Sequence, residues 1–190
     1  MITLTILGAL FVVFLMQMIF PGLTEAFMFY PDKALSQPWL FVTAIFLHAN
    51  LTHLFFNSYA LFLFGPLVER KMGKKEFLKI FFGSGILGSF LYWLTYVVGI
   101  IPPIPALGAS GAIYGIMAAA AVLYPNLRIF MFFFPMRLRE AVVVWFIISF
   151  IGTFDISSGI AAAAHLGGLI FGYLYAKDWV RKQVYEWWWI

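Results

Sequence analysis

The sequence has 190 residues, of which 64% are hydrophobic, 21% aromatic and only 11% charged. A soluble domain of this length carries far more charge, so the composition excludes a soluble protein and predicts an integral membrane protein. The net charge of +4 does not indicate a nucleic-acid partner, because the basic residues stand in short clusters between apolar runs, as they do at a membrane surface.

Six apolar runs follow one another along the chain, and most are close to the length of about 20 residues that a spanning helix needs. None shows the alternating pattern of a barrel strand. The predicted fold class is an all-α membrane protein, a bundle of six transmembrane helices in one domain over residues 1–190, with a short central fourth helix. The predicted spans are residues 2–20, 50–68, 77–100, 110–124, 141–154 and 160–176.

The connecting segments and the charges predict an orientation. Residues 23–48 are too interrupted to span a membrane and too apolar to be a free linker, so we expect them in the membrane interface, as we do residues 125–140. Six spans put both termini on one side. Eleven of the twelve Lys and Arg residues then fall on that side and only Lys33 falls opposite, which predicts cytoplasmic termini.

Ser110 lies between Gly108 and Gly111 at the start of the fourth predicted span. Small neighbours let a substrate carbonyl approach such a serine closely. Three more polar side chains fall within predicted spans, where they usually face the bundle interior: His53, Asn57 and His165. Because spans two, four and six run in the same direction, we expect all four residues at one depth, in the outer leaflet.

Small residues recur at intervals of four in spans four and six: Gly111, Gly115, Ala164, Gly168 and Gly172. Such spacing lets two helix backbones approach closely. We therefore expect spans four and six to touch where Ser110 and His165 lie.

A serine hydroxyl becomes a nucleophile when a base takes its proton, and a neutral histidine is the usual base. We predict a Ser110–His165 dyad, with Tyr114 packing beside the imidazole. Asp155 lies ten residues before His165 and is expected above its depth, so no triad is predicted. The Ser110 backbone N–H and the side chains of His53 and Asn57 are candidate donors to an oxyanion.

Other interpretations stay open at this point. Ser110 could cap a helix whose glycines serve packing only, and Asn57 could bridge two helices. His48, His53 and His165 could bind zinc, but no HExxH pattern or other ligand set accompanies them, so we expect neither a metal nor a cofactor. A transporter would need polar groups towards the cytoplasmic face, and the inner halves of spans four and six offer almost none.

Three motifs together resemble the rhomboid family of intramembrane serine proteases, in order, in spacing and in their places on spans two, four and six. The motifs are HANLTHLFFN at residues 48–57, GASG at 108–111 with Tyr114, and AHLGG at 164–168. The resemblance implies the minimal six-span core of the prokaryotic type, in a cell membrane, with Ser110 and His165 as the dyad. His53, Asn57 and the Ser110 N–H would form the oxyanion site, supported by Tyr114, Gly108, Gly111, Gly168 and His48.

The resemblance also implies what the protein would bind. Its partners would be the lipid bilayer and transmembrane protein substrates, which enter between spans two and five and are cleaved near the outer face; no oligomeric state is predicted. Residues 23–48 would form a half-submerged hairpin, in which Trp39-Leu40 replaces the common Trp-Arg, and residues 152–159 a cap. The alternative is a catalytically silent relative that binds or escorts membrane helices. Such relatives typically lack the serine or the histidine.

Overall fold

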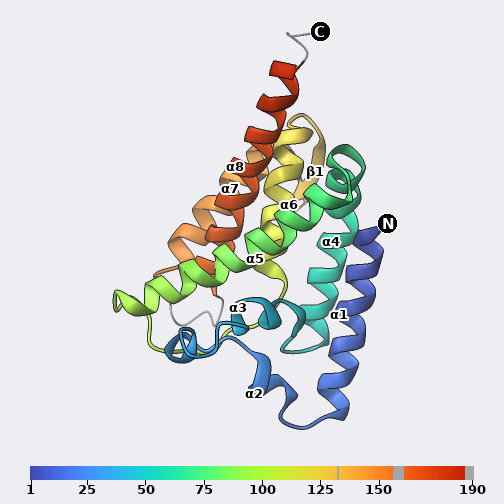
Figure 1. Cartoon of the computed structure of the whole chain (residues 1–190). Helices are drawn as coiled ribbons and strands as arrows, with labels where there is room; N and C mark the ends of the chain where they lie inside the picture. Colours follow the sequence, from blue (N-terminus) through green and yellow to red (C-terminus); the bar gives the residue numbers. More distant parts are fainter. Residues whose placement is uncertain (132, 156–160, 187–190) are drawn as a thin grey trace.

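The protein is mostly helical in its computed structural model, which describes residues 1–131, 133–155 and 161–186 (Figure 1). The longer helices are α1 (Ile2–Ile19), α4 (Leu51–Met72), α5 (Lys74–Val97), α6 (Ser110–Leu123), α7 (Leu138–Gly152) and α8 (Ala162–Glu186). Between α1 and α4 lie short turns of helix: α2 (Leu23–Phe27), η1 (Pro31–Lys33), α3 (Leu40–Thr43) and η2 (Ala44–Phe46). Within the described ranges, α1, α4 and α5 are long and apolar enough to cross a membrane, and α6 is apolar but shorter.

Several helices run beyond the apolar segments that predicted them. α4 continues to Met72, past the predicted end at residue 68, and α8 continues to Glu186, past residue 176. Both extensions are rich in Glu, Lys and Arg, which are good helix formers, so a helix continues after its apolar part ends. The predicted start of the sixth span at Ile160 lies outside the described residues.

The all-α prediction is wrong at one place. Strands β1 (Arg128–Met131) and β2 (Phe134–Arg137) pair in antiparallel fashion, with Arg128 opposite Arg137. Each strand has four residues, too few for an alternating pattern to be recognised. Phe130 and Phe133 are 81% and 98% exposed. Exposed aromatic rings of this kind suit the membrane interface in which the sequence placed this segment.

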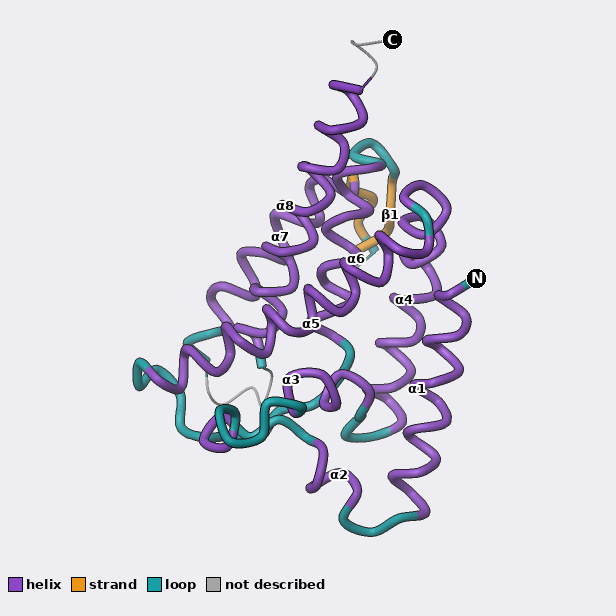
Figure 2. The backbone as a smooth tube through the Cα atoms, viewed as in Figure 1, coloured by secondary structure: helices purple, strands orange, loops and turns teal. Residues whose placement is uncertain are grey.

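α6 packs against four of the other long helices (Figure 2). Ten of its fourteen residues are buried, and it contacts α4, α5, α7 and α8. A Cβ added to Gly168 of α8 would lie 1.9 Å from the Gly111 carbonyl oxygen, and one on Gly172 would lie 2.0 Å from that of Gly115. The backbones of α6 and α8 therefore touch along the small residues whose spacing predicted the contact.

A buried carboxylate joins α1 to α4. Glu69 accepts hydrogen bonds from the Ile2 N–H at 2.7 Å, the Thr3 N–H at 2.9 Å and the Thr3 hydroxyl at 2.6 Å. The first N–H groups of a helix lack partners within it and favour a negative charge. Glu69 thus caps α1 from another helix, a contact that the sequence pattern did not indicate.

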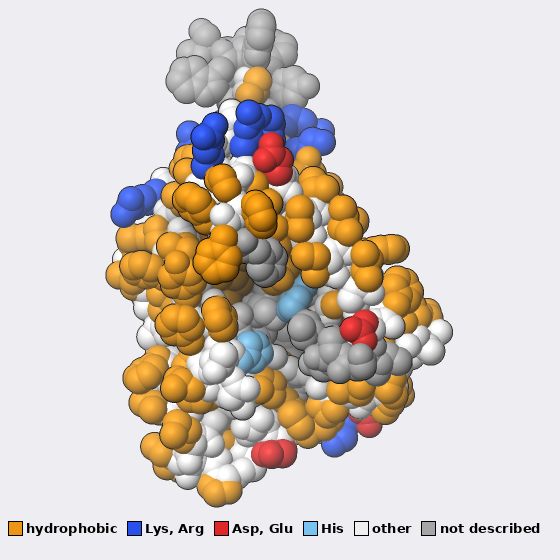
Figure 3. Space-filling view, turned by 180° about the vertical axis from the view of Figure 1, so that it is seen from behind, with side chains coloured by type: hydrophobic (Ala, Val, Ile, Leu, Met, Phe, Trp, Pro, Cys, Tyr) orange, Lys and Arg blue, Asp and Glu red, His pale blue; other side chains and the backbone are white. Residues whose placement is uncertain are grey.

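The two ends of the molecule differ in charge. Figure 3 shows Lys and Arg side chains gathered at the end that holds the C-terminal half of α8. α4, α6 and α8 all begin at the opposite end (Figure 1). The first turns of these three helices therefore lie together, away from the basic end.

Candidate functional site

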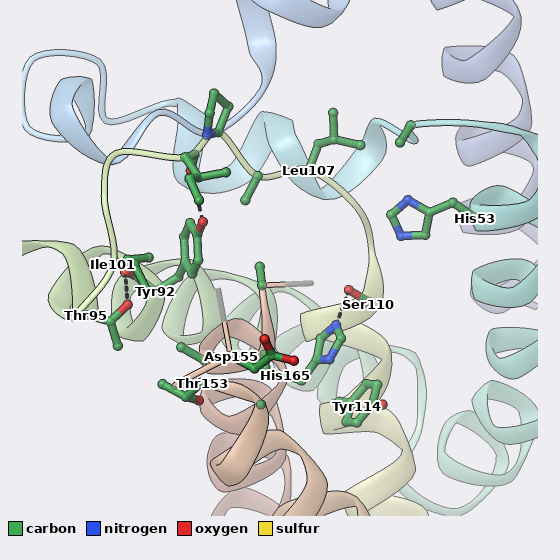
Figure 4. Close-up of a pocket in the computed structure, with 18 of the residues that line it drawn as sticks. His53, Tyr92, Thr95, Ile101, Leu107, Ser110, Tyr114, Thr153, Asp155 and His165 are labelled. Carbon is green, nitrogen blue, oxygen red and sulfur yellow. Dashed lines mark hydrogen bonds between the residues drawn. The ribbon is translucent and has the colours of Figure 1, made fainter. Parts of the chain in front are cut away.

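Ser110 is the first residue of α6, and His165 lies one turn into α8. The Ser110 Oγ is 2.8 Å from the His165 Nε2 (Figure 4). The approach is this close because Gly111 and Gly168, the next small residues on the two helices, leave no side chain between the backbones. A hydroxyl and an imidazole at this distance can exchange a proton.

Aromatic rings fix the plane of the His165 imidazole. The Tyr114 ring stacks on it, with centroids 4.3 Å apart and an interplanar angle of 8°. Trp145 of α7 meets Tyr114 edge-on at 6.4 Å, and Phe64 of α4 meets Trp145 edge-on at 6.1 Å. These ring contacts orient the histidine in addition to the hydrogen bond between its Nε2 and the Ser110 Oγ. Tyr114 was predicted from its spacing to Ser110, whereas Trp145 was not, because a tryptophan in an apolar helix looks like any other core or lipid-facing residue.

The chain just before Ser110 passes directly over two side chains of α4. Gly108 has a φ of +128°, and a Cβ there would lie 2.9 Å from the His53 Nε2 and 3.7 Å from the Asn57 Nδ2. A side chain at residue 108 would be both strained and blocked, so glycine is required. His53 and Asn57 are four residues apart in α4 and present their nitrogens on the same face, beside Ser110.

Asn57 carries a donor that the folded chain leaves unused. The residue is 7% exposed, and its Nδ2 has no hydrogen-bond partner among the described residues. A buried unpaired donor costs about 1–3 kcal/mol, which a helix-bridging asparagine would avoid. The amide is therefore available to a ligand.

His48 supports His53 from behind. It is 1% exposed, and its ring meets the His53 ring edge-on with centroids 5.1 Å apart. Gln17 of α1 holds the His48 backbone, accepting its N–H at 3.0 Å and donating to its carbonyl at 3.1 Å. Burial and the neighbouring His53 lower the pKa of His48 to about 4. His48 is therefore neutral near pH 7 and adds no positive charge beside His53.

One cavity of about 520 Å³ is lined by Ser110, His165, His53, Asn57 and Tyr114, and neither His48 nor Gln17 is among its lining residues. Figure 3 shows a hollow on the side of the molecule with histidine side chains visible in it. In the part of the chain that the structure describes, no group of three or more His, Asp or Glu residues is placed to hold a metal ion. The three histidines considered for zinc are thus not gathered around one point.

Comparison with known families decides the identity of the fold. Residues 35–181 match the family described as the Rhomboid domain. The chain belongs to the rhomboid family. Its membership, together with the long apolar helices, makes it an integral membrane protein.

Named relatives come from bacteria and from mitochondria. The chain is 35% identical over 150 residues to the putative rhomboid protease YdcA of Bacillus subtilis, covering 76% of this chain and 69% of that protein. It is 35% identical over 139 residues to the rhomboid protease GluP of the same organism, covering 73% of this chain and 25% of GluP. Rhomboid protein 1, mitochondrial, of Saccharomyces cerevisiae is 32% identical over 154 residues, covering 76% and 42%. This rhomboid chain therefore spans less than half the length of the latter two.

The rhomboid cavity has members that sequence reasoning did not assign to the site. Asp155, for which no triad role was predicted, lines the cavity together with His165 (Figure 4), and its N–H donates to the Gly152 carbonyl at 3.1 Å. Tyr92 and Thr95 of α5 also line it. In the predicted span that contains Tyr92 and Thr95, no regular spacing of polar residues distinguishes these two from their neighbours. Residues 156–159 of the predicted cap lie outside the described residues.

The hairpin segment at residues 23–48 is anchored by apolar packing. Leu40, which replaces the arginine common in rhomboids, is fully buried and packs in a cluster with Phe29, Ala44, Tyr92 and Ile101. The Tyr92 hydroxyl donates to the Ile104 carbonyl at 3.0 Å. Tyr92 thus connects the hairpin, the proline-rich segment and the wall of the cavity.

Proposed function

We propose that this rhomboid is an intramembrane serine endopeptidase that hydrolyses peptide bonds of transmembrane substrates near the outer membrane face. The observation that carries the proposal is the 2.8 Å contact between the Ser110 Oγ and the His165 Nε2 inside an accessible cavity. The names of the bacterial relatives, a putative rhomboid protease and a rhomboid protease, support it.

The proposed reaction begins when the Ser110 Oγ attacks the substrate carbonyl carbon and the His165 Nε2 takes the hydroxyl proton. The resulting oxyanion accepts hydrogen bonds from the Ser110 backbone N–H, the Asn57 amide and the His53 imidazole. His165 then gives its proton to the leaving amine, and the acyl group remains on Ser110. Water from the cavity attacks this ester, with His165 as base again, and releases the acid product.

The membrane arrangement that we propose uses six spans, α1, α4, α5, α6, α7 and α8, with α6 as the short central fourth span of a single domain over residues 1–190. Both termini lie in the cytoplasm of a prokaryotic cell. The position of the basic side chains at one end and of the first turns of α4, α6 and α8 at the other supports this orientation. The dyad then lies in the outer leaflet.

Substrate helices reach the dyad from the side, between α4 and α7. The rings of Phe64 and Trp145 are in edge contact between these two helices, and the hollow with visible histidines opens between apolar side chains (Figure 3). A transmembrane segment that unwinds there presents its backbone to Ser110 without leaving the bilayer.

A reporter with one transmembrane helix, reconstituted with the purified protein in liposomes, tests this function. We expect wild type to cleave the reporter within or near its helix and Ser110→Ala to leave it intact, with an unchanged midpoint of thermal unfolding. Ser36→Ala, which removes an exposed loop hydroxyl, is the control and should cleave normally. Cleavage by Ser110→Ala at the wild-type rate would refute the proposal. Binding of the reporter without cleavage by either protein would instead indicate a silent escort protein.

A further inference from the structure

A second groove lies between α7 and α8, apart from the cavity that contains Ser110. Its volume is about 420 Å³, and Ala121 of α6 forms part of its wall. Residues three and four apart on one face of α7 form one wall of the groove, and residues of α8 form the opposite wall. The lining residues from these two helices are Arg139, Val142, Val143, Phe146, Leu169, Ile170, Tyr173 and Leu174.

The groove opens towards the hydrocarbon core of the membrane. Val143 is 56% exposed and Leu174 is 58% exposed. An apolar space of this kind does not hold water stably, and left empty its walls lose dispersion contacts. The lining side chains that this groove presents between α7 and α8 are apolar apart from Arg139 and the hydroxyl of Tyr173. A single hydrocarbon chain fits this chemistry.

One end of the groove is basic. Arg139 lies in the first turn of α7, and Lys177 lies one turn after Tyr173 in α8, with its Nζ 5.8 Å from the Tyr173 ring centroid. Lys177 lies in the C-terminal half of α8, which reaches the end of the molecule where Lys and Arg side chains gather (Figure 3), and α7 begins towards this same end (Figure 1). A chain lying in the groove therefore has two cations at the position of its headgroup.

The acidic residues next to these cations are engaged elsewhere. Glu140 accepts the Arg137 N–H at 2.9 Å, and Asp178 pairs with Lys182 at 2.7 Å and also with Arg181. Within the described part of the chain, no carboxylate lies within ion-pair distance of Arg139 or Lys177. Both charges are thus available to a ligand outside the protein.

We propose that this groove binds one acyl chain of an anionic phospholipid, whose headgroup phosphate contacts Arg139 and Lys177. Basic side chains at a membrane surface attract anionic lipids. The guanidinium of Arg139 matches phosphate oxygens with paired donors, and Lys177 adds a point charge. The lipid comes from the leaflet at the basic end, so the site is distinct from the Ser110 cavity and does not depend on the proposed protease function.

Native mass spectrometry of the full-length protein, released from detergent micelles that contain phosphatidylglycerol or phosphatidylcholine with identical acyl chains, tests this site. We expect wild type to retain one phosphatidylglycerol in preference to phosphatidylcholine. The double variant Arg139→Gln/Lys177→Gln should lower that retention by about tenfold or more, since each basic contact contributes to headgroup binding. The matched control Lys74→Gln/Lys75→Gln removes the same charge from the same end, at exposed residues outside the groove, and should bind as wild type does.

A second variant tests the contribution of the acyl chain separately from that of the headgroup. Val143→Trp fills the groove at an exposed position without changing the charge, and should lower retention of phosphatidylglycerol while the midpoint of thermal unfolding stays within a few degrees of wild type. Equal retention of the two lipids by wild type, or undiminished retention by Arg139→Gln/Lys177→Gln, would overturn the proposal. A lipid-free dimer that Val143→Trp abolishes would also overturn it, because the groove would then be an interface between copies.

Discussion

Asn57 shows how a single residue can be fitted to a ligand instead of to its own fold. Its buried Nδ2 donates no hydrogen bond within the described residues, and it faces the backbone at Gly108, two residues before Ser110. A structural asparagine would have its donor paired. In the oxyanion site that we propose, this amide gains an acceptor when the negative oxygen forms.

Replacing Asn57 with Ala should therefore affect catalysis and not folding. Losing one oxyanion donor lowers kcat by about 10²–10³-fold, whereas removing an amide whose nitrogen is unpaired breaks no hydrogen bond from that nitrogen. Initial rates of reporter cleavage and the unfolding midpoint measure the two effects. Asn126→Ala, an exposed loop asparagine, is the control. If Asn57→Ala unfolded the protein but left kcat unchanged in the folded fraction, the asparagine would be structural.

At the residue scale, the sequence could predict polar side chains but not their surroundings. Ser110, His53, Asn57 and His165 stand out in apolar runs, and the alternating direction of the spans places them at one depth. The structure brings them into one cavity. Aromatic neighbours such as Trp145 and Tyr92 could not be singled out, because the same residue types also cover the lipid-facing surface.

At the scale of elements, the contact between α6 and α8 sets the distance between Ser110 and His165. It depends on glycines, since the missing Cβ of Gly168 would lie 1.9 Å from the Gly111 carbonyl oxygen. Any side chain there pushes the helices apart. The same displacement would widen the 2.8 Å contact between the Ser110 Oγ and the His165 Nε2.

We expect Gly168→Ala to lower both stability and activity. Overpacking of a close contact costs about 1–3 kcal/mol, and the lengthened contact between serine and histidine slows proton transfer. Thermal unfolding and reporter cleavage, measured on the same preparation, report the two losses. Gly8→Ala in α1 is the matched control, because a Cβ at Gly8 meets no atom within 4 Å. Equal behaviour of the two variants would show that the tight contact is not needed.

Helix positions followed from apolar runs, but helix ends and the hairpin did not. Charged residues after Val68 and Ala176 continue α4 and α8 because they form helix well. Strands β1 and β2 have four residues each, too few for an alternation of apolar and polar residues to be recognised. The position of Asp155 depends on the turn that ends α7, where its N–H donates to the Gly152 carbonyl, and counting residues along a helix does not capture such a turn.

For the whole molecule, the proposed orientation in the membrane would place the proposed dyad in one leaflet and the proposed lipid groove in the other. The orientation depends on eleven basic residues on one side and Lys33 on the other. Because the chain has no cysteine, a single introduced thiol reports the side on which it lies.

We expect Lys33→Cys to react with a membrane-impermeant maleimide on intact cells. Lys75→Cys should react only after the membrane is permeabilised, since residue 75 lies on the cytoplasmic side in the proposed orientation. The cysteine-free parent is the control for background labelling. The opposite labelling pattern would show that the molecule has the reverse orientation in the membrane, with the proposed dyad in the cytoplasmic leaflet.

The central claim is that His165 activates Ser110 as a nucleophile. Reaction of the purified protein with a fluorescent fluorophosphonate in detergent tests it most directly, because this reagent phosphonylates an activated serine, whose oxygen bonds to phosphorus as fluoride leaves. We predict labelling of wild type at Ser110, none of Ser110→Ala, and greatly slowed labelling of His165→Ala. Labelling of Ser110→Ala to the wild-type extent, or of His165→Ala at the wild-type rate, would contradict the claim.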